Sequence, residues 1–204
     1  MQKNIEIEVR GPLTGEQYAE MKRFFDKNAK KTNEKERVLV DYSTFLPGGV
    51  TDRTKDIRIR ATNGVPEIIV KIGRWGGNEQ RKELSVTTAP GTFDTLAEIF
   101  TALGYTKGIL AVRKSHVYEY EGVEFALVEV PGHSYYYEAE RMAHSGEDGD
   151  SLQKEIVNLC NKLGLNVFSQ EGFFAYIEKL NREANEVFDA TMVGPDYFKK
   201  RFDL

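Results

Sequence analysis

Charged and apolar residues alternate with a period of two in several short segments that lie far apart in this chain. The pattern is clearest in the segment EIEVR at residues 6–10, and it recurs in residues 81–86 and 138–140. Every second side chain of a β-strand points to the same face, so Glu6 and Glu8 would share one face of a strand. Two carboxylates about 7 Å apart repel each other by roughly 2 to 3 kcal/mol at an effective dielectric constant near 20. We therefore expect a cationic group to lie between such strands.

The composition is that of a folded chain with a substantial core. Of its 204 residues, 40% are hydrophobic and 29% charged, which suits one large domain, although two small domains would also fit. The net charge of −4 provides no overall attraction to nucleic acid or to an anionic membrane, and we expect neither as a partner. The apolar runs are too short for a transmembrane helix, and a strand pattern begins where a signal peptide would lie, so we expect a cytoplasmic protein. Cys160, the single cysteine, lies on an apolar helical stripe and is expected in the core.

Capping and turn signals divide the chain into strands and helices. Thr14 and Gln17 have the spacing of a capping box, which predicts the start of a helix. Asn63-Gly64, between two alternating segments, predicts a tight hairpin because both residues tolerate a positive φ. For residues 189–204 we find no firm pattern, and a cap over a cavity and a surface anchor remain alternatives. The expected strands cover residues 4–10, 36–45, 56–61, 67–72, 81–87, 109–120, 123–130 and 135–142. One helix is expected to begin at Thr14 and to continue through its apolar positions up to Phe25, and the other expected helices cover residues 92–103, 151–163 and 169–187.

About eight strands with interspersed helices and short connections predict an antiparallel α+β domain. On strand after strand, one face is charged and the other is apolar. Two arrangements satisfy this pattern. In the first, the charged faces point to solvent and helices cover the other side of an ordinary sheet. In the second, about eight strands close into a β-barrel, with the charged faces lining its lumen and the helices packed on its outside.

The kinds of charged residue favour the barrel. A solvated face would mix lysine, serine, threonine and glutamine, whereas arginine and glutamate dominate here. Guanidinium groups bind phosphate oxygens through two donors at once, and paired glutamates favour hard divalent cations such as Mg²⁺, so together they suit a metal-bound polyphosphate. The alternative is exposed ion pairs, for example from Arg58 and Arg60 to Glu67, each worth under about 1 kcal/mol. The residues expected on the charged faces are Glu6, Glu8, Arg10, Arg58, Arg60, Lys71, Arg81, Glu83, Lys114, His116, Glu138 and Glu140.

The order of these segments resembles that of the CYTH superfamily, the triphosphate tunnel metalloenzymes. Residues 6–10 are similar to the ExExK signature of the family, with Arg10 in place of lysine. Residues 58–60 resemble its RxR strand, and residues 114–116 resemble its KxR strand, with His116 in place of the second base. The resemblance covers roughly residues 4 to 180 and also includes segments 69–71, 81–83, 103–105 and 130–140.

This resemblance implies an antiparallel eight-stranded tunnel and a small-molecule triphosphate as substrate. Members of the family hydrolyse inorganic triphosphate, thiamine triphosphate or nucleoside triphosphates, or cyclise ATP as class IV adenylate cyclases. The resemblance also implies Mg²⁺ or Mn²⁺ as cofactor and places the tunnel domain in residues 1–188, and it leaves open whether the chain forms a homodimer. The metal wall would be Glu6, Glu8, Glu138 and Glu140, with Glu8 and Glu140 as the catalytic pair; the triphosphate cradle would be Arg10, Arg58, Arg60, Lys71, Arg81 and Lys114, with His116 close to the phosphates.

Two residues depart from the family's pattern. Val128 stands where the family usually has aspartate, and its neighbour Glu129 would face the other side of the strand. His116 replaces a base that is always charged, whereas an imidazole is cationic near neutral pH only where its surroundings favour the proton. Both changes bear on catalytic efficiency rather than on ligand binding.

Three functional hypotheses follow. The first is a Mg²⁺- or Mn²⁺-dependent triphosphatase that needs no side-chain nucleophile, because a metal and the charged walls would orient a water for in-line attack. The second is ATP cyclisation, which requires a purine pocket that we cannot identify in the sequence. The third is a polyphosphate- or nucleotide-binding module without catalysis, which Val128 and His116 favour. Trp75, in a glycine-rich loop, would stack on a nucleobase at a tunnel mouth or pack locally, and Tyr136 shares the face of the late glutamates.

Overall fold

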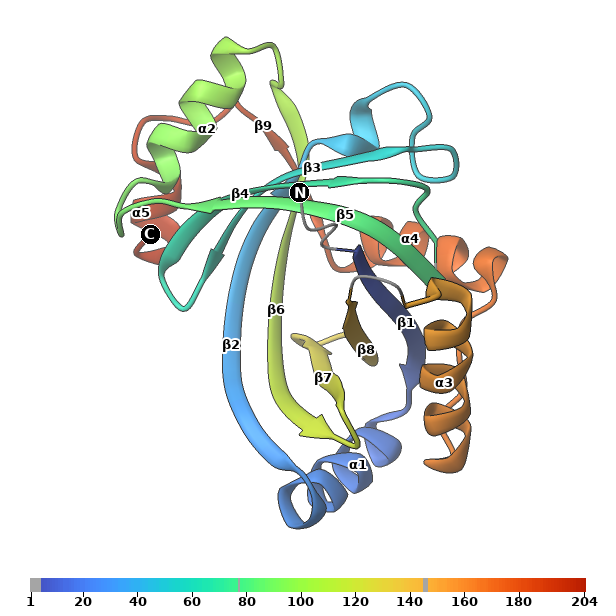
Figure 1. The fold of residues 1–204 in the computed structure, drawn as a ribbon. Coiled ribbons are helices and arrows are strands. Elements are labelled where there is room, and N and C mark those ends of the chain that lie inside the picture. Colours follow the sequence, from blue (N-terminus) through green and yellow to red (C-terminus); the bar gives the residue numbers. More distant parts are fainter. Residues whose placement is uncertain (1–4, 77, 145–146) are drawn as a thin grey trace.

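Eight strands close into an antiparallel β-barrel with helices on its outside (Figure 1). The computed structural model describes residues 5–76, 78–144 and 147–204. Around the barrel the strands follow the order β2-β3-β4-β5-β1-β8-β7-β6, and β6 pairs back with β2. This closure confirms the predicted eight-stranded barrel and rules out the one-sided sheet. The strands are β1 (Ile5–Leu13), β2 (Lys30–Asp41), β3 (Lys55–Thr62), β4 (Val65–Ile72), β5 (Asn78–Thr87), β6 (Lys107–Tyr120), β7 (Val123–Val130) and β8 (Ser134–Ala143).

The helices cover the barrel in two groups. Helices α1 and α3 lie beside β1, β7 and β8, whereas α2 and α5 pack together next to β3 (Figure 1). A short ninth strand, β9 (Glu186–Asp189), extends the sheet by pairing with residues 107–110 of β6. Among the described residues, no helix combines the length and apolar character needed to cross a membrane. The helices are α1 (Gly15–Asn28), α2 (Phe93–Ala102), α3 (Gly149–Lys162), α4 (Gln170–Glu183) and α5 (Tyr197–Phe202).

The alternating pattern of β1 separates the lumen from the outer core. Ile7 and Val9 point outward and are fully buried in a cluster that also contains Cys160 of α3. Their neighbours Glu6, Glu8 and Arg10 consequently point into the barrel. Burying apolar side chains such as these contributes about 1.5 to 3 kcal/mol each. The outer apolar face therefore holds the inward-facing charges in place.

Local signals fix the ends of several elements as the sequence predicts. The side chain of Thr14 accepts a hydrogen bond from the backbone N–H of Gln17 at 3.1 Å, and the side chain of Gln17 accepts one from the N–H of Thr14 at 2.9 Å, which completes the capping box of α1. Between β3 and β4, Asn63 and Gly64 adopt φ values of 49° and 79°. The Asn63 side chain also bonds the backbone of Glu34 and Glu36, so this hairpin is tied to β2.

The structure differs from the sequence-based prediction in three places. Helix α4 ends at Glu183 rather than at residue 187, where the chain has already entered β9. Strand β2 begins at Lys30 rather than at residue 36, and residues 43–45 form a 3-10 helix instead of extending the strand. Residues after α4 form β9 and α5, because Phe198 of α5 packs against Phe93 of α2 with ring centroids 4.6 Å apart. The carboxylate of Asp94 in α2 also accepts the backbone N–H groups of Phe198 and Lys199, both at 2.9 Å. The tail is thus anchored on the outside of the barrel.

Candidate metal and phosphate site

The lumen is a charged cavity of about 410 Å³, to which all eight barrel strands contribute side chains. This size is within the range of small-molecule sites, which is about 300 to 1,000 Å³. The predicted residues that line the cavity are Glu6, Glu8, Arg10, Arg58, Arg60, Lys71, Glu83, Glu138 and Glu140, joined by Lys35, Arg37, Asp41, Arg53, Arg113 and Glu124, which the sequence did not single out. Acidic and basic side chains from distant segments therefore meet in one enclosed space.

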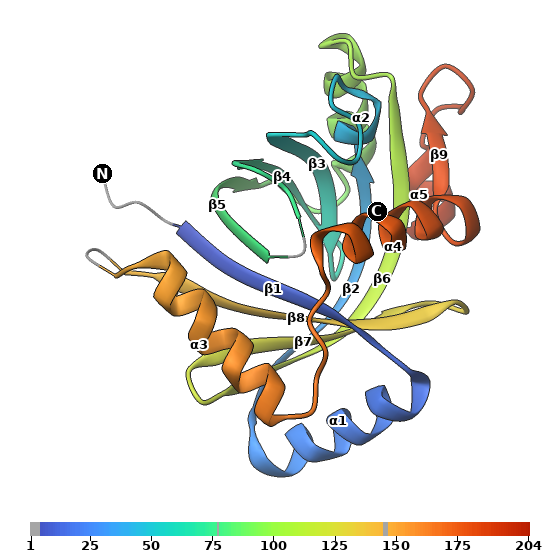
Figure 2. The same cartoon turned by 90° about the vertical axis from the view of Figure 1, so that its right-hand side faces the viewer.

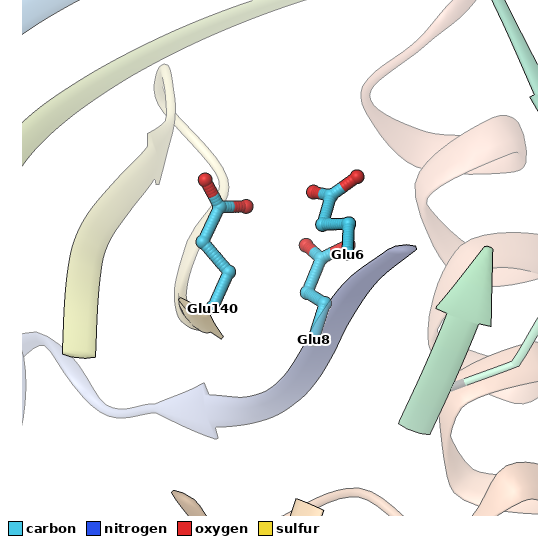
Figure 3. Close-up of side chains that lie close together, drawn as sticks. All are labelled: Glu6, Glu8 and Glu140. Carbon is cyan, nitrogen blue, oxygen red and sulfur yellow. The ribbon is translucent and has the colours of Figure 1, made fainter. Parts of the chain in front are cut away.

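Three of the four glutamates expected to bind metal converge within this cavity. Glu6 and Glu8 rise from β1 and Glu140 from β8, with their carboxylates turned toward one another (Figure 3). One oxygen from each lies within 4.8 Å of the others. Register explains part of this arrangement, because Glu8 and Glu140 are direct partners across the β1–β8 pair. We call Glu6, Glu8 and Glu140 the carboxylate trio.

The electrostatics of the carboxylate trio fit a hard divalent cation. Burial raises the pKa of Glu8 to about 7, although Arg10 and Lys71 act in the opposite direction. Burial and the charges of Glu8 and Glu6 raise the pKa of Glu140 well above its ordinary value. Like charges in a desolvated site favour the protonated forms, and a cation would favour the ionised ones. Clustered carboxylate oxygens are the donors that Mg²⁺ and Mn²⁺ prefer, so the residues present suit the expected metal.

Two carboxyl groups of the predicted metal wall, Glu6 of the trio and Glu138, have pKa values that nearby cations lower. Burial would raise the pKa of Glu6, but the ammonium group of Lys71 at 2.6 Å and a hydrogen bond from Glu140 outweigh it and lower the pKa to about 2. Glu138 lies opposite Arg10 in the β1–β8 register and accepts a hydrogen bond from its Nε at 3.3 Å. Burial likewise opposes the charge of Glu138, yet Arg10 lowers its pKa. Glu138 therefore faces the lumen beside the trio and pairs with a base.

The cations expected to cradle a triphosphate are also paired with carboxylates. Arg10 donates to Glu8 at 2.6 Å, and Arg60 donates to Glu67 at 2.7 Å. Lys71 lies 3.2 Å from Glu83. These ion pairs are largely shielded from solvent. An entering phosphate would share these donors with the carboxylates, whose charge a metal ion would offset.

A buried carboxylate, Asp56, pairs with three arginines at the lumen. Asp56 is 1% exposed and pairs with Arg58 and with Arg81, whose Nη1 lies 3.0 Å from its oxygen. Arg53 approaches the same carboxylate at 3.5 Å and Asp41 at 2.7 Å. Burial would raise the pKa of Asp56, but the three guanidinium groups outweigh it and lower the pKa far below its usual range. Arg81 is 2% exposed and shares the face of lumen-lining Glu6 in the β1–β5 register, but unlike Arg58 it does not line the cavity. We call Asp56, Arg53, Arg58 and Arg81 the Asp56 cluster.

Two residues assigned to the phosphate cradle from the sequence do not face the lumen. Lys114 and His116 point outward from β6, where Lys114 pairs with Glu36 at 3.0 Å and His116 contacts Glu34 at 3.1 Å. The inward positions of this strand belong to Arg113 and Ser115. The expectation that Lys114 and His116 line the cavity is wrong by one residue. Polar residues at four consecutive positions, 113–116, leave the phase of the alternation undefined.

An apolar wall lies on the lumen side of β7 and β8. Val128 points inward together with Ala126, and Tyr136 packs against both. Val128 thus occupies the lumen-facing position at which the family usually has aspartate, as predicted from the alternation. The cavity therefore carries one charged side and one smaller apolar side.

Helix α4 and the loop after β4 cover the same cavity. Phe173, Tyr176 and Leu180 of α4 line it, and the segment before α4 crosses β1 (Figure 2), where the N–H of Phe168 donates to the carbonyl of Arg10 at 2.8 Å. Gly11 permits this crossing, because a Cβ there would lie 1.8 Å from the carbonyl oxygen of Asn166.

Trp75 packs beneath α4 rather than standing exposed in its loop. Its ring lies 5.0 Å from the ring of Phe173, and the guanidinium carbon of Arg53 lies 3.4 Å from the centre of the Trp75 ring. Of the two roles considered from the sequence, the structure supports local packing, with the side chain only 4% exposed.

Comparison with known proteins identifies the family. The CYTH domain model matches residues 4–190, and the chain belongs to the CYTH domain family. No curated protein sequence matches it.

Several solved structures share the fold at low sequence identity. A protein from Pyrococcus horikoshii OT3 is 20% identical, with a TM-score of 0.66 over 87% of this chain and 99% of that one. A candidate adenylate cyclase from Vibrio parahaemolyticus is 14% identical, with a TM-score of 0.58 over 81% and 91%. A candidate adenylyl cyclase from Hippeastrum, described as having a dominant triphosphatase activity, is 16% identical, with a TM-score of 0.56 over 88% and 96%. At these identities the likeness shows the fold alone.

Proposed function

We propose that this protein is a Mg²⁺- or Mn²⁺-dependent triphosphatase that hydrolyses inorganic triphosphate or a related organic triphosphate in the barrel lumen. The observation that carries the proposal is the carboxylate trio, with its oxygens within 4.8 Å of one another, facing arginines and a lysine in one cavity. Neither set of charges is stable alone, whereas a metal–triphosphate complex neutralises both. Membership of the CYTH family supports a triphosphate as ligand.

The reaction is the addition of water to a terminal phosphorus with cleavage of the anhydride bond. Inorganic triphosphate would give orthophosphate and pyrophosphate. A metal ion held by Glu6, Glu8 and Glu140 would polarise the terminal phosphoryl group and lower the pKa of a bound water. Arg58, Arg60 and Lys71 would hold non-bridging oxygens and stabilise the charge that develops on them. Glu8 or Glu140 would accept the proton of the attacking water, since both carboxylates lie beside the proposed metal position.

The decisive experiment compares carboxylate variants in one assay. Purified protein is incubated with inorganic triphosphate and Mg²⁺ or Mn²⁺, or with EDTA, and orthophosphate is measured. We expect Glu8→Gln and Glu140→Gln each to lower turnover by roughly a hundredfold or more. Glu20→Gln, on the exposed side of α1, is the matched control and should retain full activity. Equal turnover in all three variants, or full turnover in EDTA, would contradict the proposal.

ATP cyclisation is the second candidate, and the apolar wall favours it. Ala126, Val128 and Tyr136 offer a surface on which a nucleobase could lie, which the charged side lacks. The same incubation with ATP distinguishes the activities, because cyclisation yields cyclic AMP and pyrophosphate whereas hydrolysis yields orthophosphate. Tight binding of triphosphate without any product would instead support a non-catalytic binding module.

A further inference from the structure

A chain of hydrogen bonds ties α4 to the turn between β7 and β8. His133, the last residue of this turn, contacts the carboxylate of Glu183 through Nε2 at 3.2 Å and the hydroxyl of Ser134 through Nδ1 at 2.8 Å. The Ser134 hydroxyl lies 2.9 Å from the hydroxyl of Tyr176. Tyr176 lies in the middle of α4 and Glu183 is its last residue, so the chain of bonds holds the helix at two points. We call His133, Ser134, Tyr176 and Glu183 the α4 latch.

The α4 latch holds the helix that covers the lumen. The cavity is lined by one face of α4, with Phe173, Tyr176, Ile177, Leu180 and Asn181. Tyr176 meets Tyr136 of β8 edge to face with ring centroids 6.0 Å apart, so one end of the latch lies beside the lumen. The chain is also bonded to the barrel before α4, through Phe168, and after it, through Asn185. The latch adds an attachment for the helix itself.

The latch is complete in both charge states of the imidazole. A carboxylate only accepts hydrogen bonds, so Nε2 of His133 donates to Glu183, and Nδ1 of the neutral ring accepts from the hydroxyl of Ser134. The oxygen of Ser134 then accepts from Tyr176. Burial raises the pKa of Tyr176, although the bond to Ser134 and the charge of Arg113 act against it, so Tyr176 remains a hydroxyl. In the protonated ring both nitrogens donate, and the hydroxyl of Ser134 turns toward Tyr176.

Protonation of His133 changes the strength of one contact. The contact with Glu183 becomes an ion pair, and charge-assisted hydrogen bonds are roughly twice as strong as neutral ones. The hydrogen bond from His133 is the main cause that lowers the pKa of Glu183, which keeps this partner ionised. Lys179 and Arg182 of α4 also face Glu183, at 3.9 and 3.7 Å, and their charges act against a cation on the imidazole. The His133 side chain is only 17% exposed, so water screens the new ion pair less than an open surface pair.

We propose that His133 and Ser134 are positioning residues that hold α4 over the lumen, and that the helix is held more tightly when His133 is protonated. Imidazole groups change their charge between about pH 5 and pH 8. The lumen should therefore open beneath α4 more often at alkaline than at acidic pH, and any ligand that passes there would exchange faster at alkaline pH. This inference goes beyond the proposed triphosphatase function and does not depend on it.

Hydrogen–deuterium exchange of the full-length protein in EDTA measures how often α4 is released. A helix of 14 residues is marginal in water once it leaves the barrel, so its amides exchange when the latch opens. Protection factors at pH 5.5 and pH 8 already account for the intrinsic pH dependence of exchange. We expect those of α4 to be roughly threefold to tenfold higher at pH 5.5. Helix α3, which has the same length and packs against β1 and β8, is the internal reference and should show no such difference.

Four variants assign the effect to the latch. His133→Gln and Glu183→Gln should each abolish the pH dependence and leave α4 with the protection that the wild type has at pH 8. The matched control is His116→Gln, because His116 also contacts an exposed glutamate, 3.1 Å away on the outer face of β6, and this variant should keep the wild-type difference. Ser134→Ala should lower the protection of α4 at both pH values, since Tyr176 loses its partner. Ser134→Thr keeps the hydroxyl and should restore the protection.

The outcomes separate the two parts of the proposal. Equal protection of α4 at both pH values in the wild type would overturn the role of protonation. A wild-type difference in His133→Gln would overturn it too and would point to the lumen carboxyl groups, of which Glu8 has a pKa of about 7. Wild-type protection in Ser134→Ala, with thermal unfolding showing a folded variant, would overturn the positioning role. Because neither metal nor substrate is present, none of these results bears on the triphosphatase, and an inactive protein would leave the latch unaffected.

Discussion

The carboxylate trio and the Asp56 cluster both bury carboxylates in the barrel, yet the pKa of Asp56 is lowered, whereas two of the three carboxyl groups of the trio have raised pKa values and only Glu6, beside Lys71, has a lowered one. Around Asp56, three guanidinium groups compensate one carboxylate, and its pKa is lowered. In the trio, carboxylates lie against one another, and the pKa values of Glu8 and Glu140 are raised. The first arrangement is complete without a ligand and stabilises the wall. The second is incomplete, which is the pattern of a site that awaits a cation.

The largest expected effect is the loss of stability when the Asp56 cluster is broken. Asp56→Asn leaves Arg53, Arg58 and Arg81 buried with too little negative charge, and we expect it to lower the free energy of unfolding by about 3 to 5 kcal/mol. Urea unfolding followed by circular dichroism measures this change. The exposed Asp52, four residues earlier, provides the control, and Asp52→Asn should stay within about 0.5 kcal/mol of the wild type. Similar stabilities for the two variants would remove the contrast with the trio.

Removing a carboxylate from the trio is expected not to destabilise the metal-free protein. In EDTA, Glu140→Gln should be at least as stable as the wild type, because the change removes a group that its carboxylate neighbours disfavour in the ionised form. With Mn²⁺ at about a hundred times its Kd, the wild type should gain roughly 2.7 kcal/mol, and the variant much less. Thermal unfolding with and without Mn²⁺ tests both statements. A variant that is strongly destabilised in EDTA would place Glu140 with the structural charges instead.

The affinity of the carboxylate trio for a metal ion should depend on pH. A cation binds the ionised form of Glu8, whose pKa is raised to about 7, so Mn²⁺ affinity should fall by up to about tenfold per unit as pH drops below 7. Calorimetric titrations at pH 6, 7 and 8 measure this dependence and the accompanying proton release. An affinity that does not change between pH 8 and 6 would show that Glu8 is ionised throughout.

The metal-free protein gives the complementary test. Because the folded pKa of Glu8 is raised from 4.5 to about 7, its stability contribution is present below pH 4.5 and is lost as pH rises to about 7. Asp56 has a lowered folded pKa, so its contribution is present above its unfolded pKa of 3.8 and is lost only as pH falls below that value. Unfolding free energies in EDTA between pH 3 and 8, measured for the wild type, Glu8→Gln and Asp56→Asn, separate the two trends.

The smallest effect is expected on the outer face of β6. Lys114→Gln and His116→Gln each remove a group that the structure places outside the lumen, where it pairs with an exposed glutamate. Both variants should keep kcat/KM within about twofold of the wild type, which corresponds to about 0.5 kcal/mol. A tenfold loss of kcat/KM in either variant would indicate that Lys114 or His116 faces the lumen, as the sequence suggested.

Where the apolar residues of a strand alternate clearly, the sequence predicts its inward face. In β1, Ile7 and Val9 must be buried outside, and this determines where Glu6 and Glu8 point. In β6, four consecutive positions are polar, so alternation does not show which of them face the lumen. The packing of Tyr118 on Phe25 of α1 places Tyr118 on the outer face and thereby determines which side chains point inward. Residues 30–37 are all polar or charged, so alternation does not reveal that Arg37 faces the lumen.

The pairing register between strands could not be predicted from the sequence for a related reason. Alternation places Glu138 and Glu140 on one face, but it does not reveal that Glu138 lies opposite Arg10 and Glu140 opposite Glu8. The role of Asp56 likewise depends on three arginines from β3, β5 and the preceding loop, whose approach no single segment encodes. Periodicity therefore predicted the lumen and most of its charged residues, whereas the division of those residues into compensated and uncompensated groups required coordinates.

The packing of Trp75 has a practical consequence. It is the sole tryptophan of the chain, and its ring lies between Arg53, which belongs to the Asp56 cluster, and Phe173, which also lies 5.3 Å from the guanidinium carbon of Arg10. A phosphate that draws Arg10 away from Glu8 and Glu138 would change the surroundings of this one indole. The intrinsic fluorescence of the unlabelled protein should consequently report when the tunnel fills, and a stopped-flow trace would time that event separately from bond cleavage.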